Sequence, residues 1–479
     1  MTHNPVSWLV LERAQGGLEA QVYHQIRARI LAGALASGEK LPSSRALAAA
    51  LGLSRKTVTD AYDRLRAEGF IAASQGAATR VASLPPAPQG AARPGAPPGA
   101  ALMPALPPAP AEPERFMPFR PGLPDLASLP EAAWGRCLAA RARHLRIHDM
   151  GYGEEAGLPA LRRAIIAHVA RARAVVADPA QVIILPSTAA ALDLAARLTL
   201  APGDRVWIEE PGYPTAQAIL ARNGAALVPV PCDGEGMDVA AAEGLPPRLI
   251  HVTPSHQYPT GVAMSLARRL DLLERAAAHG AFVIEDDYDS EFHYTARPLA
   301  ALQGIDRQGR VIYLGTFSKV LAPGIRVAYA IFPPALLAAA RGAVRLMGAS
   351  VAVQVQAALA DFLEEGHLRA HIRRMRPIYH QRMLDTAALM ARVGGAGWRA
   401  GPCDGGLQWP VWCQGADDTA LAAALQAAGI GALALSRFFL GPARPGLLLG
   451  IAGATPARLA GLERQVLRLR SGLDQPQCG

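Results

Sequence analysis

The sequence of 479 residues is too long for one ordinary hydrophobic core, so we expect two or more domains. Although 51% of the residues are hydrophobic, no uncharged apolar run is long enough to cross a membrane and the first residues lack the basic start of a secretory signal, so we expect a cytoplasmic protein without a membrane partner. Five widely separated cysteines indicate neither a metal site nor a disulfide framework, whereas a net charge of +9 is compatible with a nucleic-acid partner.

Three amphipathic helices are predicted within the first 70 residues, because apolar residues recur there at helical spacing. The first helix should end near Gly33 and the second at Gly52, while Ser54 can cap the third. Two helices joined around Gly52 and Leu53 form a helix-turn-helix. The residues expected on the inner faces are Val22, Ile26, Ile30, Leu47, Leu51, Val58, Ala61, Tyr62 and Leu65.

The start of the third helix is the part expected to face DNA, since the first turn of the second helix in such a unit enters the major groove. That turn carries Arg55, Lys56 and Thr57, with Thr59 on the same outer side. Residues 1–82 hold ten Lys or Arg against six Asp or Glu, a net charge of +4. This small domain therefore carries nearly half of the excess positive charge.

Beyond Phe70, the segment IAASQGAATRVA reads as two short strands turning at Gly76, a wing able to lie along a DNA backbone. The stretch LPSSRALAAALGLSRKTVTDAYDRLRAEGF closely resembles the winged-helix DNA-binding domain of the GntR family, which implies that residues 1–82 bind double-stranded operator DNA. The contacts that the resemblance implies are Ser44, Arg45, Ser54, Arg55, Lys56 and Thr57, with Thr79 and Arg80 in the wing. The alternative is a three-helix bundle with a solvated basic face.

Residues 83–113 are predicted to be a linker, because proline, alanine and glycine dominate and no amphipathic period is present. About thirty residues fully extended span on the order of 100 Å. A partly extended, semi-rigid tether of this kind would let the basic domain move relative to the rest.

Residues 114–479 alternate between strand-like and helix-like stretches, which predicts an α/β domain with a mostly parallel sheet covered by helices. The apolar segments expected to be strands are 182–185, 205–208, 249–253, 281–286 and 311–317. Helices are expected between several of them, including 189–198 and 266–279.

The segment VIYLGTFSKVLAPGIR at 311–326 places a polar cluster at the carboxyl end of a buried strand, where open α/β sheets bind ligands. Lys319 follows the hydroxyls of Thr316 and Ser318, and Arg326 lies seven residues later. Hydroxyls, backbone N–H groups and a guanidinium around one amine suit a phosphate held beside a Schiff-base lysine.

GTFSK followed by proline, glycine and arginine resembles the cofactor-lysine segment of the fold-type I, pyridoxal-phosphate-dependent aminotransferases. The resemblance implies that Lys319 carries pyridoxal 5'-phosphate (PLP) as an internal aldimine and that Thr316 and Arg326 bind the cofactor phosphate. The alternative for a lone lysine here is a surface residue in a strand-to-helix turn.

In AFVIEDDYDSEF, Asp286 and Tyr288 are two residues apart and so face one side of the strand, while Glu285 and Asp287 face the other. A carboxylate can keep the pyridine nitrogen protonated, and a phenol can hydrogen-bond the ring's 3-oxygen. EDDY resembles the motif of aminotransferase-like regulators, in which these two positions have those roles. Taken alone, an acidic strand end is a solvated edge or a metal site.

Three further segments resemble parts of the same cofactor site. Ser187 and Thr188 open a helix, where hydroxyls and free N–H groups can hold a phosphate, although such a pair alone is simply a helix cap. By resemblance, Tyr213 in EEPGYP lies near the cofactor ring. Tyr152, before GEEAGLPALRRAI, resembles the tyrosine that reaches the phosphate of the neighbouring subunit, which implies a homodimer.

Two positions depart from the pattern of working aminotransferases. Tyr258 stands where those enzymes usually have asparagine, and the histidine and glutamine before it are typical of the regulator branch. In the C-terminal lobe, about 336–479, Leu448 stands where the enzymes commonly have the arginine that binds the substrate carboxylate. Arg437 is a plausible replacement, or an ordinary surface arginine.

A winged helix joined through a linker to an aminotransferase-like domain with a smaller C-terminal α+β lobe resembles the MocR branch of GntR-type transcriptional regulators. The resemblance implies a dimeric regulator that senses PLP or an amino compound by aldimine exchange. The alternatives are a catalytically active aminotransferase with an accessory DNA-binding module, and a regulator that has lost the cofactor and keeps the fold for dimerisation.

Overall fold

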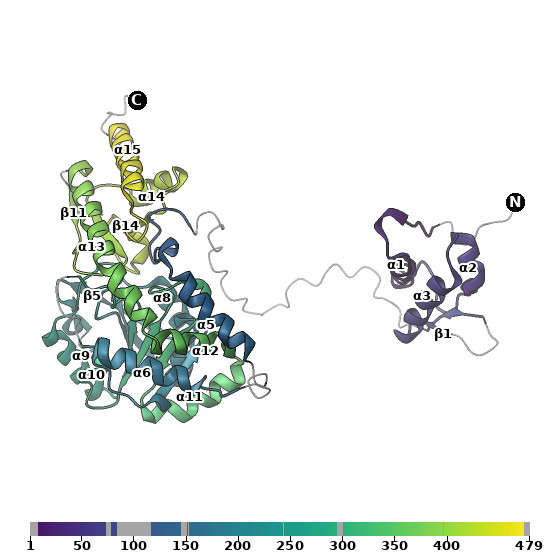
Figure 1. Ribbon diagram of the computed structural model, residues 1–479, viewed down its shortest axis with the longest axis horizontal. Coiled ribbons are helices and arrows are strands. Elements are labelled where there is room, and N and C mark those ends of the chain that lie inside the picture. Colours follow the sequence, from purple (N-terminus) through teal and green to yellow (C-terminus); the bar gives the residue numbers. More distant parts are fainter. Residues whose placement is uncertain are drawn as a thin grey trace. The chain divides into compact units, whose positions relative to one another are not determined.

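The computed structural model describes residues 8–72, 78–83, 116–144, 151, 153–242, 244–294, 300–395 and 397–473 (Figure 1). The chain divides into two compact units, residues 1–108 and 109–479, and each is described by itself. None of the helices in these ranges is long and apolar enough to span a membrane.

The first unit is a three-helix domain with a two-stranded sheet, and this agrees with the predicted winged helix-turn-helix. Its apolar residues form one core in which every predicted inner-face residue is buried except Leu51, which is partly buried. The side chain of Ser54 caps the third helix by accepting a 3.1 Å hydrogen bond from the backbone N–H of Thr57. The elements are η1 Arg13–Gln15, α1 Leu18–Leu31, α2 Ser44–Leu51, α3 Arg55–Ala67, β1 Ile71–Ala72 and β2 Arg80–Val81.

The wing is fixed to the segment before α2 by backbone hydrogen bonds. β1 and β2 pair antiparallel, Leu41 donates to the carbonyl of Thr79 at 2.9 Å, and Val81 donates to that of Glu39 at 2.9 Å. The predicted turn at Gly76 lies outside the described residues.

The larger unit is built on an eight-stranded sheet in the order β3-β10-β9-β8-β7-β4-β5-β6. Strands β9, β8, β7, β4 and β5 run parallel; β10 is antiparallel to both β3 and β9, so β3 has the direction of β9. The strands are β3 Val182–Leu185, β4 Arg205–Glu210, β5 Ala226–Asp233, β6 Gly236–Met237, β7 Leu249–Val252, β8 Phe282–Asp287, β9 Val311–Thr316 and β10 Ala328–Ile331.

Successive side chains of a strand point to opposite faces of the sheet, and most side chains on both faces of this sheet are apolar. Helices therefore cover both faces. On β9, Ile312 and Leu314 pack on the side of α7 and α11, whereas Val311 and Tyr313 pack on the side of α6 and α9. The predicted mostly parallel α/β domain is confirmed. The helical elements are η2 Leu126–Ser128, α5 Glu131–Arg143, α6 Pro159–Arg173, η4 Pro179–Gln181, α7 Thr188–Thr199, α8 Pro214–Arg222, η5 Val239–Ala242, α9 Leu266–Ala278, α10 Leu302–Ile305, η6 Pro323–Ile325, α11 Pro334–Met347 and α12 Val353–Glu364.

A smaller lobe follows, with the long helix α13 His367–Val393 running from α12 to a second sheet (Figure 1). That sheet is antiparallel, with the order β11-β12-β14-β13. Its elements are β11 Trp398–Ala400, β12 Gln408–Cys413, α14 Asp418–Ala427, β13 Leu433–Ala434, η7 Leu435–Phe438, β14 Gly446–Gly450 and α15 Pro456–Leu473.

Candidate functional site

The carboxyl ends of six strands lie at one edge of the larger sheet, since β3, β4, β5, β7, β8 and β9 share a direction, and all of them except β5 lead into the site. The segments that follow these strands contain the residues singled out in the sequence. They are Ser187 after β3, Tyr213 after β4, the loop 253–261 after β7, Tyr288 after β8 and Lys319 after β9. Five segments distant in sequence thus form one candidate site.

Lys319 is partly buried at this edge, and its Nζ donates a 2.6 Å hydrogen bond to the carbonyl of Gly122. Burial lowers the pKa of the Lys319 amine, while the carboxylates of Asp289 and Asp286 oppose that shift. Gly122 has φ 80°, and a Cβ there would lie 2.9 Å from Nζ. The segment before α5 therefore approaches the amine as closely as a glycine permits.

Asp286 is buried on β8 with one carboxylate oxygen, Oδ1, lacking a hydrogen-bond partner among the described residues. Its Oδ2 lies 3.8 Å from Nε2 of His251, a buried histidine on β7. Asp287, the next residue, is bound on the opposite face by Arg173 at 2.8 Å and by the phenol of Tyr313 at 2.6 Å. An unsatisfied buried carboxylate oxygen is costly, so Asp286 is suited to receive a proton donor from a ligand.

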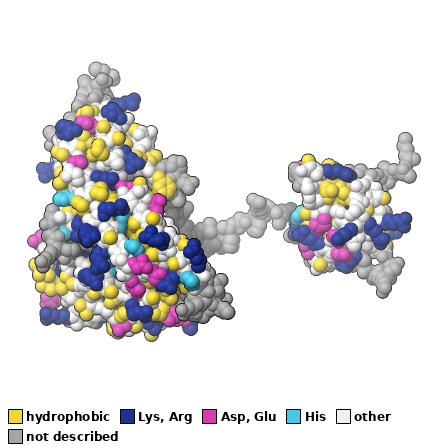
Figure 2. Space-filling view, viewed as in Figure 1, with side chains coloured by type: hydrophobic (Ala, Val, Ile, Leu, Met, Phe, Trp, Pro, Cys, Tyr) yellow, Lys and Arg dark blue, Asp and Glu magenta, His cyan; other side chains and the backbone are white. Residues whose placement is uncertain are grey.

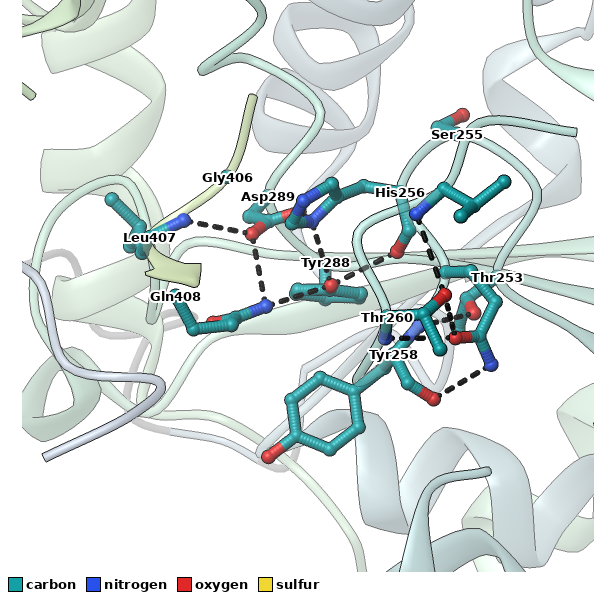
Figure 3. A network of polar contacts seen from close by, with 12 residues as sticks. Thr253, Ser255, His256, Tyr258, Thr260, Tyr288, Asp289, Gly406, Leu407 and Gln408 are labelled. Atoms are coloured by element: carbon teal, nitrogen blue, oxygen red, sulfur yellow. Dashed lines mark hydrogen bonds and ion pairs between the residues drawn. The ribbon is translucent and has the colours of Figure 1, made fainter. Parts of the chain in front are cut away.

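Tyr288 is the centre of a polar network that joins the large sheet to the small lobe (Figure 3). Its phenol donates to the carbonyl of His256 at 2.9 Å and accepts from Nε2 of Gln408 on β12 at 2.8 Å. Nδ1 of His256 lies 2.9 Å from the same oxygen and 3.2 Å from a carboxylate oxygen of Asp289. A bond from Tyr288 to a cofactor oxygen therefore requires the phenol to exchange one of these partners.

Gly406, two residues before Gln408, presses on the same network from the small lobe. It has φ 80°, and a Cβ at this position would lie 2.0 Å from Cε1 of His256. No side chain fits between the lobe and the histidine ring.

Aromatic rings pack around Tyr258, whose phenol points away from the polar network (Figure 3). Its ring contacts those of Tyr213, Tyr288 and Phe438 edge-on, with centroids 5.5, 5.7 and 5.4 Å away. Burial raises the pKa of Tyr258, and the neighbouring guanidiniums of Arg437 and Arg120 oppose the shift. This cluster forms an apolar wall with cationic groups beside it.

Leu448 packs behind this apolar wall. Leu448 is fully buried on β14 in an apolar cluster with Leu433, Leu435 and Phe438. Arg437, by contrast, is exposed, and its guanidinium lies 5.9 Å from the Phe438 ring centroid.

The residues expected to bind phosphate include hydroxyl side chains and an arginine whose backbone is in the left-handed conformation. Oγ1 of Thr316 accepts a 3.1 Å bond from the N–H of Ser318, and Oγ of Ser187 caps α7 by accepting from Ala190 at 3.1 Å. Thr188 is the first residue of that helix, and Tyr152 lies outside the described residues. Arg326 is exposed and has φ 56°, a conformation that a non-glycine residue adopts at a cost.

The donor set fits PLP in three respects. A helix N-terminus with hydroxyls suits a phosphate, the unpartnered Oδ1 of Asp286 suits a pyridine N–H, and the partly buried amine of Lys319 suits an aldehyde. The apolar wall at Tyr258 provides a surface for a flat ring.

The candidate DNA interface lies on the first unit, where α2 and α3 begin. Arg45, Arg55 and Lys56 are exposed, and their charged side-chain groups make no hydrogen bond or ion pair with other described residues. The hydroxyls of Ser54 and Thr57 lie 2.8 Å apart and serve the cap of α3. Cationic side chains at a helix start, free to reach phosphates or base edges, are what duplex recognition uses.

Three other expected contacts are placed differently. Ser44 is the first residue of α2 and is partly buried. Thr79 contributes its carbonyl to the wing, and the guanidinium of Arg80 donates to the carbonyl of Gly38 at 2.8 Å.

Comparison with known proteins agrees with this two-part architecture. Residues 18–81 match the family described as bacterial regulatory proteins, gntR family, and residues 138–459 match aminotransferase class I and II. The chain is 40% identical over 464 residues to the probable rhizopine catabolism regulatory protein MocR of Rhizobium meliloti, covering 94% of this chain and 93% of that protein. The chain belongs to the MocR subfamily of GntR-type transcriptional regulators.

Other relatives of this MocR-type chain include regulators and enzymes. It is 32% identical over 434 residues to the HTH-type pyridoxine biosynthesis transcriptional regulator PdxR of Corynebacterium glutamicum, covering 88% of this chain and 89% of that protein. The crystal structure of kynurenine aminotransferase from Pyrococcus horikoshii is similar with a TM-score of 0.69 and 25% identity over 75% of this chain and 92% of that one. The chain is therefore a DNA-binding transcriptional regulator with a fold-type I aminotransferase domain, as the sequence predicted.

The structure also places residues in the site that the sequence did not single out for it. Gly122 and Gln408 approach it from segments 197 residues before Lys319 and 120 residues after Tyr288. Neither stands in a motif of its own, so only the fold identifies them. His251 was detectable as a polar residue inside an apolar strand, LIHV.

Proposed function

We propose that the regulator binds PLP at Lys319 and senses an amino compound, or the cofactor itself, by exchange of the amine bonded there. The observation that supports this most directly is the pair formed by the Lys319 amine, whose pKa burial lowers, and the buried Asp286 with its unpartnered oxygen. When bound, PLP supplies an aldehyde that condenses with amines and a ring that withdraws electrons.

Each expected residue then has a defined task in the proposal. Asp286 would keep the pyridine nitrogen protonated, Tyr288 would hydrogen-bond the 3-oxygen in place of one of its present partners, and Tyr213 would pack near the ring. Arg437 receives an effector carboxylate. The phosphate is held by Thr316, Ser318, Arg326, Ser187 and Thr188, with Tyr152 contributed across a homodimer.

The link from ligand to DNA is proposed to pass through the small lobe. The Tyr288–Gln408 hydrogen bond joins the end of β8 to β12, so a change in the partners of Tyr288 alters what holds the lobe in place. Residues 83–113 are proposed as the tether between this domain and the winged helix. In a cytoplasmic homodimer, the two lobes would set which spacing of winged helices is favoured on the operator.

Lys319 provides an unusually clean test, because Lys40, Lys56 and Lys319 are the only lysines of the sequence. Addition of PLP should give visible absorbance, and borohydride reduction should then attach the pyridoxyl group to the peptide that contains Lys319. Lys319→Ala should abolish both signals, whereas the matched control Lys56→Ala should keep them. A reduced protein labelled at Lys40 or Lys56 would refute the proposed site.

A half-reaction assay separates sensing from catalysis. With a panel of amino donors, a sensor should change its absorbance and its operator affinity with slow or no turnover, since Leu448 cannot bind a carboxylate. Rapid multiple turnover would instead favour a working aminotransferase with an accessory DNA-binding module.

A further inference from the structure

A cavity of about 510 Å³ lies between α6, the end of α12 and the first turns of α13, outside the candidate cofactor site. Five arginines line it together with two glutamates, a charge of +3 with His168 neutral. We call it the arginine cavity. Its arginines are Arg171, Arg173, Arg369, Arg373 and Arg376.

Three of these arginines lack partners within the described part of the chain. Arg369 and Arg373 are one helical turn apart on α13, so their side chains project from the same face, and Arg171 projects from α6 into the same cavity. All three are exposed, and none of their guanidinium groups forms a hydrogen bond or ion pair with another described residue. Like charges that line one cavity repel one another, and a bound anion would relieve that repulsion.

The two carboxylates in the wall do not neutralise this group. Glu291 lies 3.5 Å from Nε2 of His168, and Arg376 donates to the carbonyl of Glu291 at 2.7 Å. Glu364 is exposed at the end of α12. At the inner end Arg173 is buried and paired with Asp287 at 2.8 Å.

The shape of the cavity indicates the kind of anion. Its apolar floor includes Leu363, Leu368 and Ile372, and its volume lies in the range of small-molecule sites. Because the site is a hollow lined partly by apolar side chains, a compact small molecule fits it better than an extended DNA backbone does. Figure 2 shows Lys and Arg side chains on this side of the larger unit, with acidic groups between them. Guanidiniums on two facing helices suit a ligand with more than one charged group.

We propose that the arginine cavity binds a small polyanion carrying phosphate groups, gripped by Arg171 from one helix and by Arg369 and Arg373 from the other. This site is independent of the proposed cofactor site. It would give the regulator a second small-molecule input.

Calorimetric titration of the full-length protein with diphosphate tests this site. Diphosphate should bind, and Arg369→Gln/Arg373→Gln should weaken binding at least about tenfold. The matched control Arg163→Gln/Arg399→Gln removes the same charge from exposed positions outside the cavity and should bind diphosphate as the parent does. Arg171→Gln alone should also weaken binding, which keeps the test decisive if the double variant is unstable.

Three results would overturn the proposal. One is no binding of diphosphate by the parent protein, and another is equal binding by parent, cavity variants and control. The third is loss of operator affinity in the cavity variants without any diphosphate binding, which would assign these arginines to the DNA backbone.

Discussion

Gln408 donates a 2.8 Å hydrogen bond to the phenol oxygen of Tyr288 and thereby connects the sheet of the small lobe to the end of β8. The same amide lies 3.4 Å from Asp289, so one side chain contacts two residues that follow the strand carrying Asp286. Gln408 is buried and Tyr288 partly buried, and removal of their contact leaves polar atoms without partners.

Gln408→Leu is therefore expected to destabilise the larger unit by about 1–3 kcal/mol and to weaken the effect of an amine on operator affinity. Urea unfolding and fluorescence anisotropy with operator DNA would measure the two effects. Gln381→Leu, which removes an exposed amide from α13, should change neither. A normal amine response in Gln408→Leu would remove this contact from the proposed signal route.

Gly122→Ala should displace the amine of Lys319. The added methyl group would meet Nζ at 2.9 Å, and the φ of 80° adds backbone strain of about 1–2 kcal/mol. We expect weaker PLP binding, measured by absorbance titration. Gly342→Ala on α11, where a Cβ meets open space, should bind PLP normally. Unchanged PLP affinity in Gly122→Ala would mean that PLP binding does not depend on the close contact between Gly122 and Nζ of Lys319.

Two buried carboxyl groups predict a stability that falls as the pH rises. Burial raises the pKa of Glu209 to about 7, and burial together with the charge of Asp287 raises that of Glu285 to about 7. Because the folded state holds these protons more tightly than the unfolded state, their contribution is fully present below about pH 4.5 and is lost as the pH rises through about 7.

Glu209→Gln should therefore reduce the loss of unfolding free energy between about pH 4.5 and pH 7 by roughly 3 kcal/mol or less. Its Oε1 has no hydrogen-bond partner in the described ranges, so a neutral amide can take its place. Urea midpoints at a series of pH values would show the change. The exposed Glu274→Gln on α9 serves as the control, and an equally steep profile in Glu209→Gln would contradict the assignment.

Arg55→Ala and Arg45→Ala should each weaken operator binding by about 1–3 kcal/mol. If the replaced arginine contacts a phosphate, its substitution should also reduce the magnitude of the slope of log affinity against log salt by about 0.9. Arg66→Ala, near the other end of α3 and paired with Asp63, should leave both quantities close to those of the parent. Footprints unaltered by both substitutions would move the interface away from α2 and α3.

Local patterns were sufficient to predict much of this structure. The predicted strand 182–185 has the same bounds as β3. The alternation of side chains along β8 also predicts that Asp286 and Asp287 face opposite sides of the sheet, and their different partners, His251 and Arg173, agree. Each such inference depends on residues within one element, where periodicity and apolar content decide the conformation.

Long-range contacts were beyond reach for a physical reason. β10 lies antiparallel between β3 and β9, and its four apolar residues carry no sign of direction. Gly122 and Gln408 reach the site only because the chain closes on itself over more than a hundred residues. Leu51 had the spacing of an inner residue, but the helix ends there and leaves it partly exposed.

The close fit of Gly406 against His256 has a mechanical consequence. Hydrogen bonds at this junction depend on which protons are present, whereas contact between a bare backbone and an imidazole ring depends only on volume. The steric limit that Gly406 sets on the approach of the small lobe to His256 should therefore not change with pH or ionic strength. Any rearrangement of the ring must then be transmitted as a displacement of the strand itself.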